Sequence, residues 1–429
     1  MSSRPVSLWR QRDFRLLWGG SLVSEIGSSV TTIALPLAAV EVLRASTFQV
    51  AMLSAATSAA FLLVALPAGV LVDRAAKRPL MLASDLLRAV LLAAVPITAA
   101  LGVLSLPILY ADAVLTGVLT VVFDVAYQSF LPTLVGRDRL VEANSKFGLP
   151  SSLSNVIGPS LGGSLVAAVG AAQAVVVDAA SYVVSVCTLA MMRTREPTKR
   201  TTPTRTTSSV RQDIAAGLSF VARHTLLRRV VACTASSNLF NSMRTAITVV
   251  FLVRVLHAAP GTIGLVYMLG SAGGVAGGFL AGPSARVLGS ARALWLGKLA
   301  LGWMVLAIPL ARPGHGVFLV SFGAFVSSFS VVVFNVSSVS YRQAVCPPEL
   351  LGRMNASIRW IIWGTMPLGA VLGGTLATAF GIRATLTVAV LGSWLSVLWI
   401  VASPLRGMRT IPVHSAYSPV ADSQADSTA

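Results

Sequence analysis

LPILYADAVLTGVLTVVFDVAYQS, residues 106–129, is long and apolar enough to cross a lipid bilayer as one helix, with Asp112 and Asp124 as its charged residues. A helix rises about 1.5 Å per residue, so about 20 residues cross the roughly 30 Å hydrocarbon core. Similar stretches recur along the chain, separated by short loops. The twelve spans that we expect are residues 14–41, 47–72, 79–100, 106–129, 147–170, 172–192, 229–253, 262–282, 290–311, 315–340, 356–380 and 382–404. The sequence therefore predicts an all-α integral membrane protein.

The composition supports this class. The chain has 429 residues, of which 55% are hydrophobic and only 11% are charged, whereas a soluble domain carries about 25% charged residues. Cys187, Cys233 and Cys346 lie in three separate apolar stretches, so neither a disulfide framework nor a metal site is indicated. The sequence has no Gly-x4-Gly-Lys-[Ser/Thr] loop for ATP phosphates. We therefore expect neither an enzyme nor a cofactor.

The distribution of basic residues predicts the orientation. With both ends on one side, 25 of the 33 basic residues fall in the termini and the even-numbered loops, and four fall in the odd-numbered loops. Basic loops stay in the cytoplasm, so we expect a multi-pass protein of the plasma membrane with both termini cytoplasmic. The net charge of +18 then faces anionic lipid rather than nucleic acid. We expect two bundles, residues 1–192 and 229–404, with a cytoplasmic linker at 193–228 and a disordered tail at 405–429.

An internal repeat relates the two halves. At an offset of 211 residues, Leu140 falls on Leu351, Asn144 on Asn355, and Ser185 on Ser396. The glycines at 158, 162, 163 and 170 fall on glycines at 369, 373, 374 and 381. Two halves in the same orientation are parallel repeats related by an axis along the membrane normal. The sequence thus predicts two six-helix bundles that expose a site between them to one side at a time.

Several motifs resemble a known family. The segment from Gly69 to Arg78, GVLVDRAAKR, resembles the loop signature of the major facilitator superfamily, with Ala76 where a second glycine is usual. Gly158-Pro159-Ser-Leu-Gly162-Gly163 resembles the core of its antiporter motif, with Ser154 in place of the upstream glycine. Other segments are similar to the drug–proton antiporter branch that includes macrolide efflux proteins and the enterobactin exporter. They are residues 123–132, 178–182, 217–220, 342–343 and 352–353.

The resemblance implies a twelve-helix major facilitator fold of two six-helix bundles, and candidates for a gate. Asp73 and Arg74 lie at a membrane boundary, where a pair across helices can form in one state and separate in the other. For Lys77 and Arg78 we favour simple anchoring of the topology. The full set of candidate gate residues is Gly69, Asp73, Arg74, Lys77, Arg78, Asp85, Arg88, Asp124, Gln128, Gly158, Pro159, Gly162, Gly163, Arg342, Gln343 and Arg353.

Within that set, two pairs have helical spacing. Asp85 and Arg88 in the third span are expected to pair with each other or to extend the gate network. Asp124 and Gln128 in the fourth span are expected to pair structurally. An arginine that many drug exporters carry in the fourth span is missing here.

Glu25 is the strongest single candidate for a proton-carrying residue. It lies ten residues after Arg15, about 15 Å into the membrane, where an unpaired charge costs about 3 kcal/mol or more. Ser28, Ser29 and Thr32 share its helix face, which suggests the wall of a watery cavity. Loss of water favours the neutral form of a carboxyl, as a proton carrier requires. The alternative is a structural carboxylic acid bonded to a neighbouring helix.

Other polar residues within the spans complete the candidate site. Asp112 and Arg244 both lie in the outer half of the membrane and could pair across the two halves; Asp112 is a second candidate proton carrier. Asn238, Asn241 and Thr245 form a polar face on the seventh span with Arg244, and Asn335 lies on the tenth. These side chains could hold substrate or make interhelical hydrogen bonds.

We therefore expect a secondary transporter, monomeric, that exports a small amphipathic compound such as a drug, a macrolide-like metabolite or a siderophore in exchange for protons. Uptake of a nutrient by the same fold is the alternative. A membrane sensor or assembly partner without flux is a third reading, which the short loops disfavour.

Overall fold

The computed structural model describes residues 7–194, 218–346 and 351–409, which are helical with no strand in these ranges. The first half comprises η1 (Leu8–Arg10), α1 (Arg12–Glu41), α2 (Thr47–Arg74), α3 (Lys77–Ala100), α4 (Leu106–Val135), η2 (Arg137–Arg139), α5 (Leu140–Val169) and α6 (Ala171–Ala190). The second half comprises α8 (Thr225–Arg254), α9 (Pro260–Leu288), α10 (Ser290–Ala293), α11 (Leu296–Gly302), η3 (Trp303–Leu306), α12 (Ala307–Leu310), α13 (Gly316–Val345), α14 (Leu351–Phe380), α15 (Ile382–Leu395), α16 (Leu398–Val401) and η4 (Pro404–Arg406).

The predicted twelve spans are present. Eleven described segments are long and apolar enough to cross a membrane. The remaining one is α8, whose 30 residues include four arginines that lower its hydropathy. The ninth span consists of the pieces α10 to α12, and the twelfth of α15 and α16. Most helices are longer than their apolar stretch, because further helical turns of polar residues continue beyond the hydrocarbon. For example, α4 ends at Val135 and α5 begins at Leu140.

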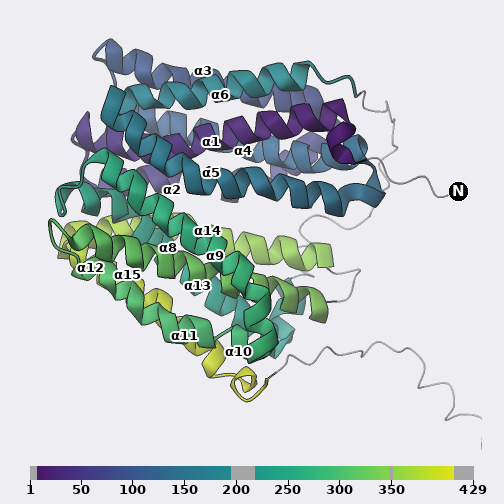
Figure 1. Cartoon of the computed structure of the whole chain (residues 1–429), viewed down its shortest axis with the longest axis vertical. Coiled ribbons are helices and arrows are strands. Elements are labelled where there is room, and N and C mark those ends of the chain that lie inside the picture. Colours follow the sequence, from purple (N-terminus) through teal and green to yellow (C-terminus); the bar gives the residue numbers. More distant parts are fainter. Residues whose placement is uncertain (1–6, 195–217, 347–350, 410–429) are drawn as a thin grey trace, which may run out of the picture.

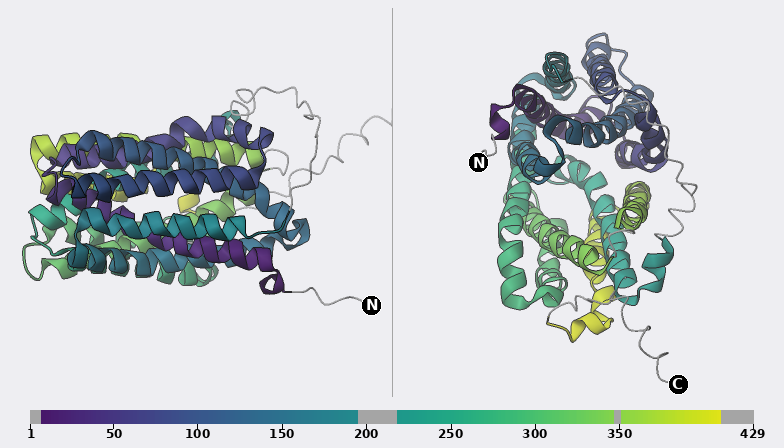
Figure 2. Two further views of the ribbon diagram at one scale, coloured as in Figure 1. Left: turned by 90° about the horizontal axis from the view of Figure 1, so that it is seen from above. Right: turned by 90° about the vertical axis from the view of Figure 1, so that its right-hand side faces the viewer.

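The spans form two bundles. Figure 1 shows α1–α6 grouped in its upper half and α8–α15 in its lower half, with the long helices of each group packed side by side. The end-on view in Figure 2 separates the two groups of helices. Between the halves, α2 packs against α14 and α5 packs against α9. We refer to the end that holds Leu8 and η4 as the termini end, and to the other as the far end. The exact bundle boundaries stay predictions.

The helix crossings obey the predicted repeat. A Cβ at Gly162 would lie 3.1 Å from Val30 Cα on α1, and one at Gly373 would lie 2.6 Å from the Met243 carbonyl oxygen on α8. The loops that follow also match, because Gly170 and Gly381 both adopt a positive φ, of 90° and 85°. Glycine accepts this φ without steric cost. Thus α1 and α5 cross in the first bundle as α8 and α14 cross in the second.

Apolar side chains cover the outside of the protein. Phe279, Phe318 and Phe380 are 78%, 72% and 73% exposed, and Leu63 is 72% exposed. Large apolar groups in this number on an exterior indicate contact with lipid rather than water. The backbone groups are paired within helices, as a lipid surrounding requires.

Candidate functional site

A cavity of about 800 Å³ is lined by residues of α1–α6. Its ionisable lining groups are Glu25, Asp112, Asp124, Asp178 and Arg88. Hydroxyl groups and the rings of Phe61, Phe123, Tyr127, Phe147 and Tyr182 form most of the remaining wall. The lining reaches Asn144, close to the start of α5 at the termini end. The cavity thus combines acidic groups with aromatic surface, which suits an amphipathic guest.

Glu25 lies near the middle of α1 and faces this cavity, as predicted. Ser151 on α5 is its hydrogen-bonding neighbour, and Asp124 on α4 is close enough to interact electrostatically. A partly exposed carboxyl in a membrane span is costly unless it is hydrated or protonated. The position therefore allows the group to exchange a proton with water in the cavity. Whether it carries protons stays a prediction.

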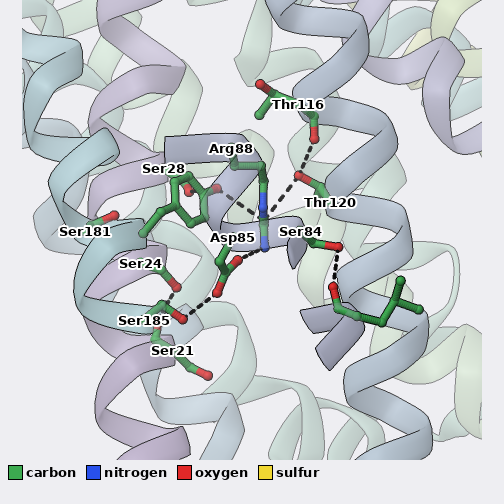
Figure 3. Close-up of polar contacts among 12 residues, drawn as sticks. Ser21, Ser24, Ser28, Ser84, Asp85, Arg88, Thr116, Thr120, Ser181 and Ser185 are labelled. Carbon is green, nitrogen blue, oxygen red and sulfur yellow. Dashed lines mark hydrogen bonds and ion pairs between the residues drawn. The ribbon is translucent and has the colours of Figure 1, made fainter. Parts of the chain in front are cut away.

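Arg88 is the centre of a buried polar network (Figure 3). Its guanidinium forms an ion pair with Asp85, and it donates to Thr120 Oγ1 at 3.4 Å and to the Tyr182 hydroxyl at 3.3 Å. Ser185 Oγ on α6 donates to the second Asp85 oxygen at 2.6 Å. The predicted pairing of Asp85 with Arg88 is thus present. It connects α3, α4 and α6 inside one bundle, and the role of the pair as a gate stays a prediction.

The network continues to α1 through Ser28. Its hydroxyl lies 2.9 Å from the Tyr182 hydroxyl and donates to Asp178 Oδ1 at 3.3 Å. Thr32 also lines the cavity, whereas Ser29 donates to Ser154 in the contact between α1 and α5. Of the predicted serine and threonine face, Ser28 and Thr32 therefore lie at the cavity, and Ser29 serves helix packing.

Asp112 lines the same cavity on α4. Its side chain is only 5% exposed, and its Oδ1 atom has no hydrogen-bond partner. Asp178 is close enough to interact with it electrostatically. An unpaired buried acceptor is expensive, so Oδ1 of Asp112 is a candidate contact for a proton or a donor that enters the cavity. Asp124 faces the cavity as well, but the exposed Gln128 does not, and the expected pairing of those two is not formed.

The polar face of the second bundle lines two adjoining cavities. Asn238, Asn241, Arg244 and Asn335 line one of about 50 Å³, and Thr245 lines one of about 230 Å³. Arg244 donates to Asn241 Oδ1 at 2.7 Å and to Ser327 Oγ at 3.4 Å. Arg244 and Asp112 therefore do not pair in this conformation, contrary to the suggestion from their depths.

The predicted gate residues near the second loop, between α2 and α3, have local roles in this conformation. Arg78 donates to the carbonyl oxygens of Leu189 and Ala190, at 3.0 and 2.8 Å, and so caps the end of α6. Lys77 donates to the Ala75 carbonyl. A Cβ at Gly69 would meet nothing within 4 Å. The side chains of Asp73, Arg74, Gln343 and Arg353 lie outside the described part of the structure. Arg342 donates to Ser338 within α13.

The glycines of the antiporter-like motif lie in tight contacts. A Cβ at Gly158 would lie 2.3 Å from Ser29 Cβ on α1. At the far end, a Cβ at Gly163 would lie 2.5 Å from the Pro260 carbonyl oxygen, and one at Gly264 would lie 2.5 Å from that of Pro159. The backbones of α5 and α9 therefore touch across the two halves, as small residues allow.

The second contact between the halves has the same position in the repeat. A Cβ at Gly374 on α14 would lie 2.7 Å from Ala51 Cβ on α2. Arg254, at the end of α8, also donates to the Ala45 carbonyl in the first loop. These contacts close the far end, while the cavity lining extends toward the termini end.

Two residues, Tyr182 and Lys298, lie at more important positions in the structure than the sequence indicates. Tyr182 connects Arg88 to Ser28, although the sequence placed it only in a family motif. Lys298 lies within a span and lines the 50 Å³ cavity beside Arg244. The cost of a charge in lipid, which singled out Glu25, applies equally to Lys298. Among the described residues, no group of three or more His, Cys, Asp or Glu side chains is placed to hold a metal ion.

Comparisons with known proteins agree with this architecture. A family model described as "Transmembrane secretion effector" matches residues 3–425. The Multidrug efflux pump Tap of Mycolicibacterium fortuitum is 26% identical over 380 residues, covering 86% of this chain and 90% of that protein. The pump of the same name from Mycobacterium tuberculosis strain H37Rv is 25% identical over 389 residues, covering 86% and 88%.

Solved structures share the fold at lower identity. An inward-facing, occupied structure of a bacterial homologue of the human lysosomal transporter Spinster has a TM-score of 0.71 at 14% identity, covering 94% of this chain and 97% of that chain. An inward-facing bacterial homologue of the iron transporter ferroportin has a TM-score of 0.70 at 16% identity, covering 92% and 99%. The predicted fold of twelve helices in two bundles is thus confirmed.

Proposed function

Because this chain belongs to the family of transmembrane secretion effectors, within the major facilitator superfamily, we propose that it exports small amphipathic compounds across the plasma membrane by alternating access, in exchange for protons. The observation that carries the proposal is the 800 Å³ cavity, which joins carboxyl groups to aromatic surface inside a membrane-spanning bundle. The names of the two mycobacterial relatives support drugs as the class of cargo.

The proposed orientation follows from charge. The termini end carries most of the basic residues, so it faces the cytoplasm. The closed far end then faces outward, and the cavity takes up cargo from the cytoplasm. The likeness to two inward-facing transporters supports the same assignment.

In the proposed mechanism, protons bias the two conformations. Glu25 and Asp112 are neutral when protonated and charged when not, and each form favours a different exposure of the cavity. The network around Arg88 holds α3, α4 and α6 together, so the first bundle moves as one body. Opening of the far end then separates α5 from α9 and α2 from α14 at their glycine contacts.

Everted membrane vesicles test export directly. Vesicles that contain the protein should accumulate a drug when a proton gradient, acidic inside, is imposed, and the accumulation should vanish when an ionophore collapses that gradient. Drug movement in the reverse direction would favour the alternative, uptake of a nutrient by the same fold. Binding of a partner protein without any flux would favour the sensor reading.

A further inference from the structure

Within the described residues, two cations inside the second bundle, Arg244 and Lys298, have no ion pair with an acidic side chain. Residues 218–346 and 351–409, the described part of that half, contain no Asp or Glu. Arg244 on α8 and Lys298 on α11 nevertheless lie within membrane spans. A cation in such a place is kept only where it pairs, is hydrated, or serves a ligand or ion.

The neighbours of both cations are neutral. Lys298 donates to Ser237 Oγ, lies 4.0 Å from Cys233 Sγ, and stands 5.0 Å from the centroid of the Phe334 ring. Arg244 donates to an amide oxygen and a hydroxyl, as described above. Hydroxyl, amide and ring groups solvate a cation, but they leave its full charge available to an anion.

Lys298 and Arg244 line the same small cavity. Its volume of about 50 Å³ has room for roughly three to five water molecules, or for one carboxylate group. The amides of Asn238 and Asn335 and the hydroxyls of Ser330 and Ser393 line it as well. These groups supply further hydrogen-bond donors, which an anion requires.

Arg244 also lines the adjoining 230 Å³ cavity, whose walls include Val266, Tyr267, Ile308 and Val320. That cavity is larger and more apolar along these residues. A molecule with a charged head and a small organic body fits the pair of cavities better than a free ion does. The head would lie between the two cations and the body beside Tyr267.

We propose that the second bundle contains a binding site for a small organic anion, whose carboxylate or similar group lies between Lys298 and Arg244. The site deepens the proposed function by naming a chemical class of ligand, and it rests on that function only for the step from binding to transport. Binding itself is measurable without any flux.

The test uses the purified full-length protein in detergent, in a buffer free of chloride and carboxylates. Sodium benzoate, its neutral analogue benzamide, and sodium chloride are titrated separately, and affinity is read from calorimetry and from the shift in the thermal unfolding midpoint. Benzoate should bind and raise the midpoint, whereas benzamide should not. Lys298→Met and Arg244→Met should each weaken benzoate binding about tenfold or more, because each removes a charge-assisted hydrogen bond.

Matched variants keep the test decisive. Lys146→Met removes a lysine that pairs with Glu142 on α5 of the other bundle, and it should leave benzoate affinity unchanged. Lys298→Arg and Arg244→Lys preserve the charge and should keep affinity within a few-fold, so they serve where a neutral variant does not fold.

Equal binding of benzoate and benzamide, or unchanged benzoate affinity in the folded neutral variants, would overturn the proposal. If chloride raises the unfolding midpoint and benzoate does not, the site binds an inorganic anion, and the proposal of an organic ligand is overturned. If benzoate binds but vesicles transport no drug, the anion site is supported and the export proposal is contradicted. If vesicles export drug but the protein does not bind benzoate, the export proposal is supported and the anion site is contradicted.

Discussion

In the first bundle, Arg88 is held by Asp85, whereas in the second bundle Lys298 donates to a serine. The starts of α1 and α8 are 213 residues apart, and the same offset takes Asp85 to Lys298. It also takes Glu25 to Asn238. One scaffold therefore holds carboxyl groups and a paired arginine in the first half, and cations without an ion pair in the described part of the second. The helix crossings are shared, whereas the interior charges differ.

The largest expected effect is a difference in stability between removing one partner of an ion pair and removing a charge that has no ion-pair partner. Asp85→Asn leaves Arg88 buried without its carboxylate, so the free energy of unfolding should fall by about 3–5 kcal/mol. At the matching position, Lys298→Met strands no opposite charge and should change that free energy by less than about 1 kcal/mol. Thermal and denaturant unfolding of the purified variants measures both. Equal losses at the two positions would show that the halves do not differ in this way.

The second prediction concerns proton coupling in the acidic half. Glu25→Gln keeps the shape of the side chain but fixes it in a neutral form, so drug accumulation in everted vesicles should lose its dependence on the proton gradient. A coupling free energy of 1–3 kcal/mol corresponds to a loss of about 5–150-fold. Glu142→Gln, at the exposed end of α5, is the matched control and should transport normally. Wild-type coupling in Glu25→Gln would remove this residue from the mechanism.

The third prediction tests the contact that both halves share. Gly163→Ala places a methyl group against the Pro260 carbonyl, and such overpacking should destabilise the closed far end by about 1–3 kcal/mol. Thr57 on α2 lines the 800 Å³ cavity. A cysteine placed there, in a background without the native cysteines, should then react faster with an impermeant maleimide added from the far-end side of the membrane. The matched control is Gly148, which lies on α5 as Gly163 does. A Cβ at Gly148 would meet nothing within 4 Å, so Gly148→Ala should leave the labelling rate unchanged. No difference between the two variants would locate the closure elsewhere.

The smallest expected effect concerns how each bundle fastens its last helix. In the first bundle the Arg78 side chain caps α6, whereas in the second the Ala291 amide on α10 donates to the carbonyl of Arg409, in the segment that follows η4. Arg78→Gln should therefore lower the free energy of unfolding by about 1 kcal/mol and leave transport per folded molecule intact. Stability is measured by thermal unfolding and transport in vesicles normalised to folded protein. A selective loss of transport would restore Arg78 to the gate.

Much of the fold followed from the sequence because hydropathy and repetition are local signals. The glycine offsets predicted crossings that the structure shows at Gly162 and Gly373. The pieces α10 to α12 were not foreseen, because an apolar run has the same hydropathy whether its helix is continuous or broken. The ends of α4 and α5 were missed since polar turns outside the hydrocarbon leave no apolar trace.

The candidate site was predicted in part. Depth and charge were enough to single out Glu25 and Asp112, which both line the cavity, and spacing was enough to pair Asp85 with Arg88. Which face a hydroxyl presents depends on how neighbouring helices rotate, so Ser29 could not be separated from Ser28 by spacing. Arg244 and Asp112 have similar depths, but depth gives no lateral position, and each lies among its own bundle's side chains.

The far-end contacts between the halves involve main chain and the smallest side chains, with Gly163 against the backbone of Gly264 and Gly374 against the methyl group of Ala51. Such contacts depend on shape and dispersion, and they do not depend on which residues line the cavities. The inner surfaces of the two halves can therefore differ in charge, as they do at Asp85 and Lys298, while these closing contacts are kept. The same tolerance makes the molecule a promising scaffold for redesigning cargo choice, since new pocket chemistry need not be reconciled with the closing surface.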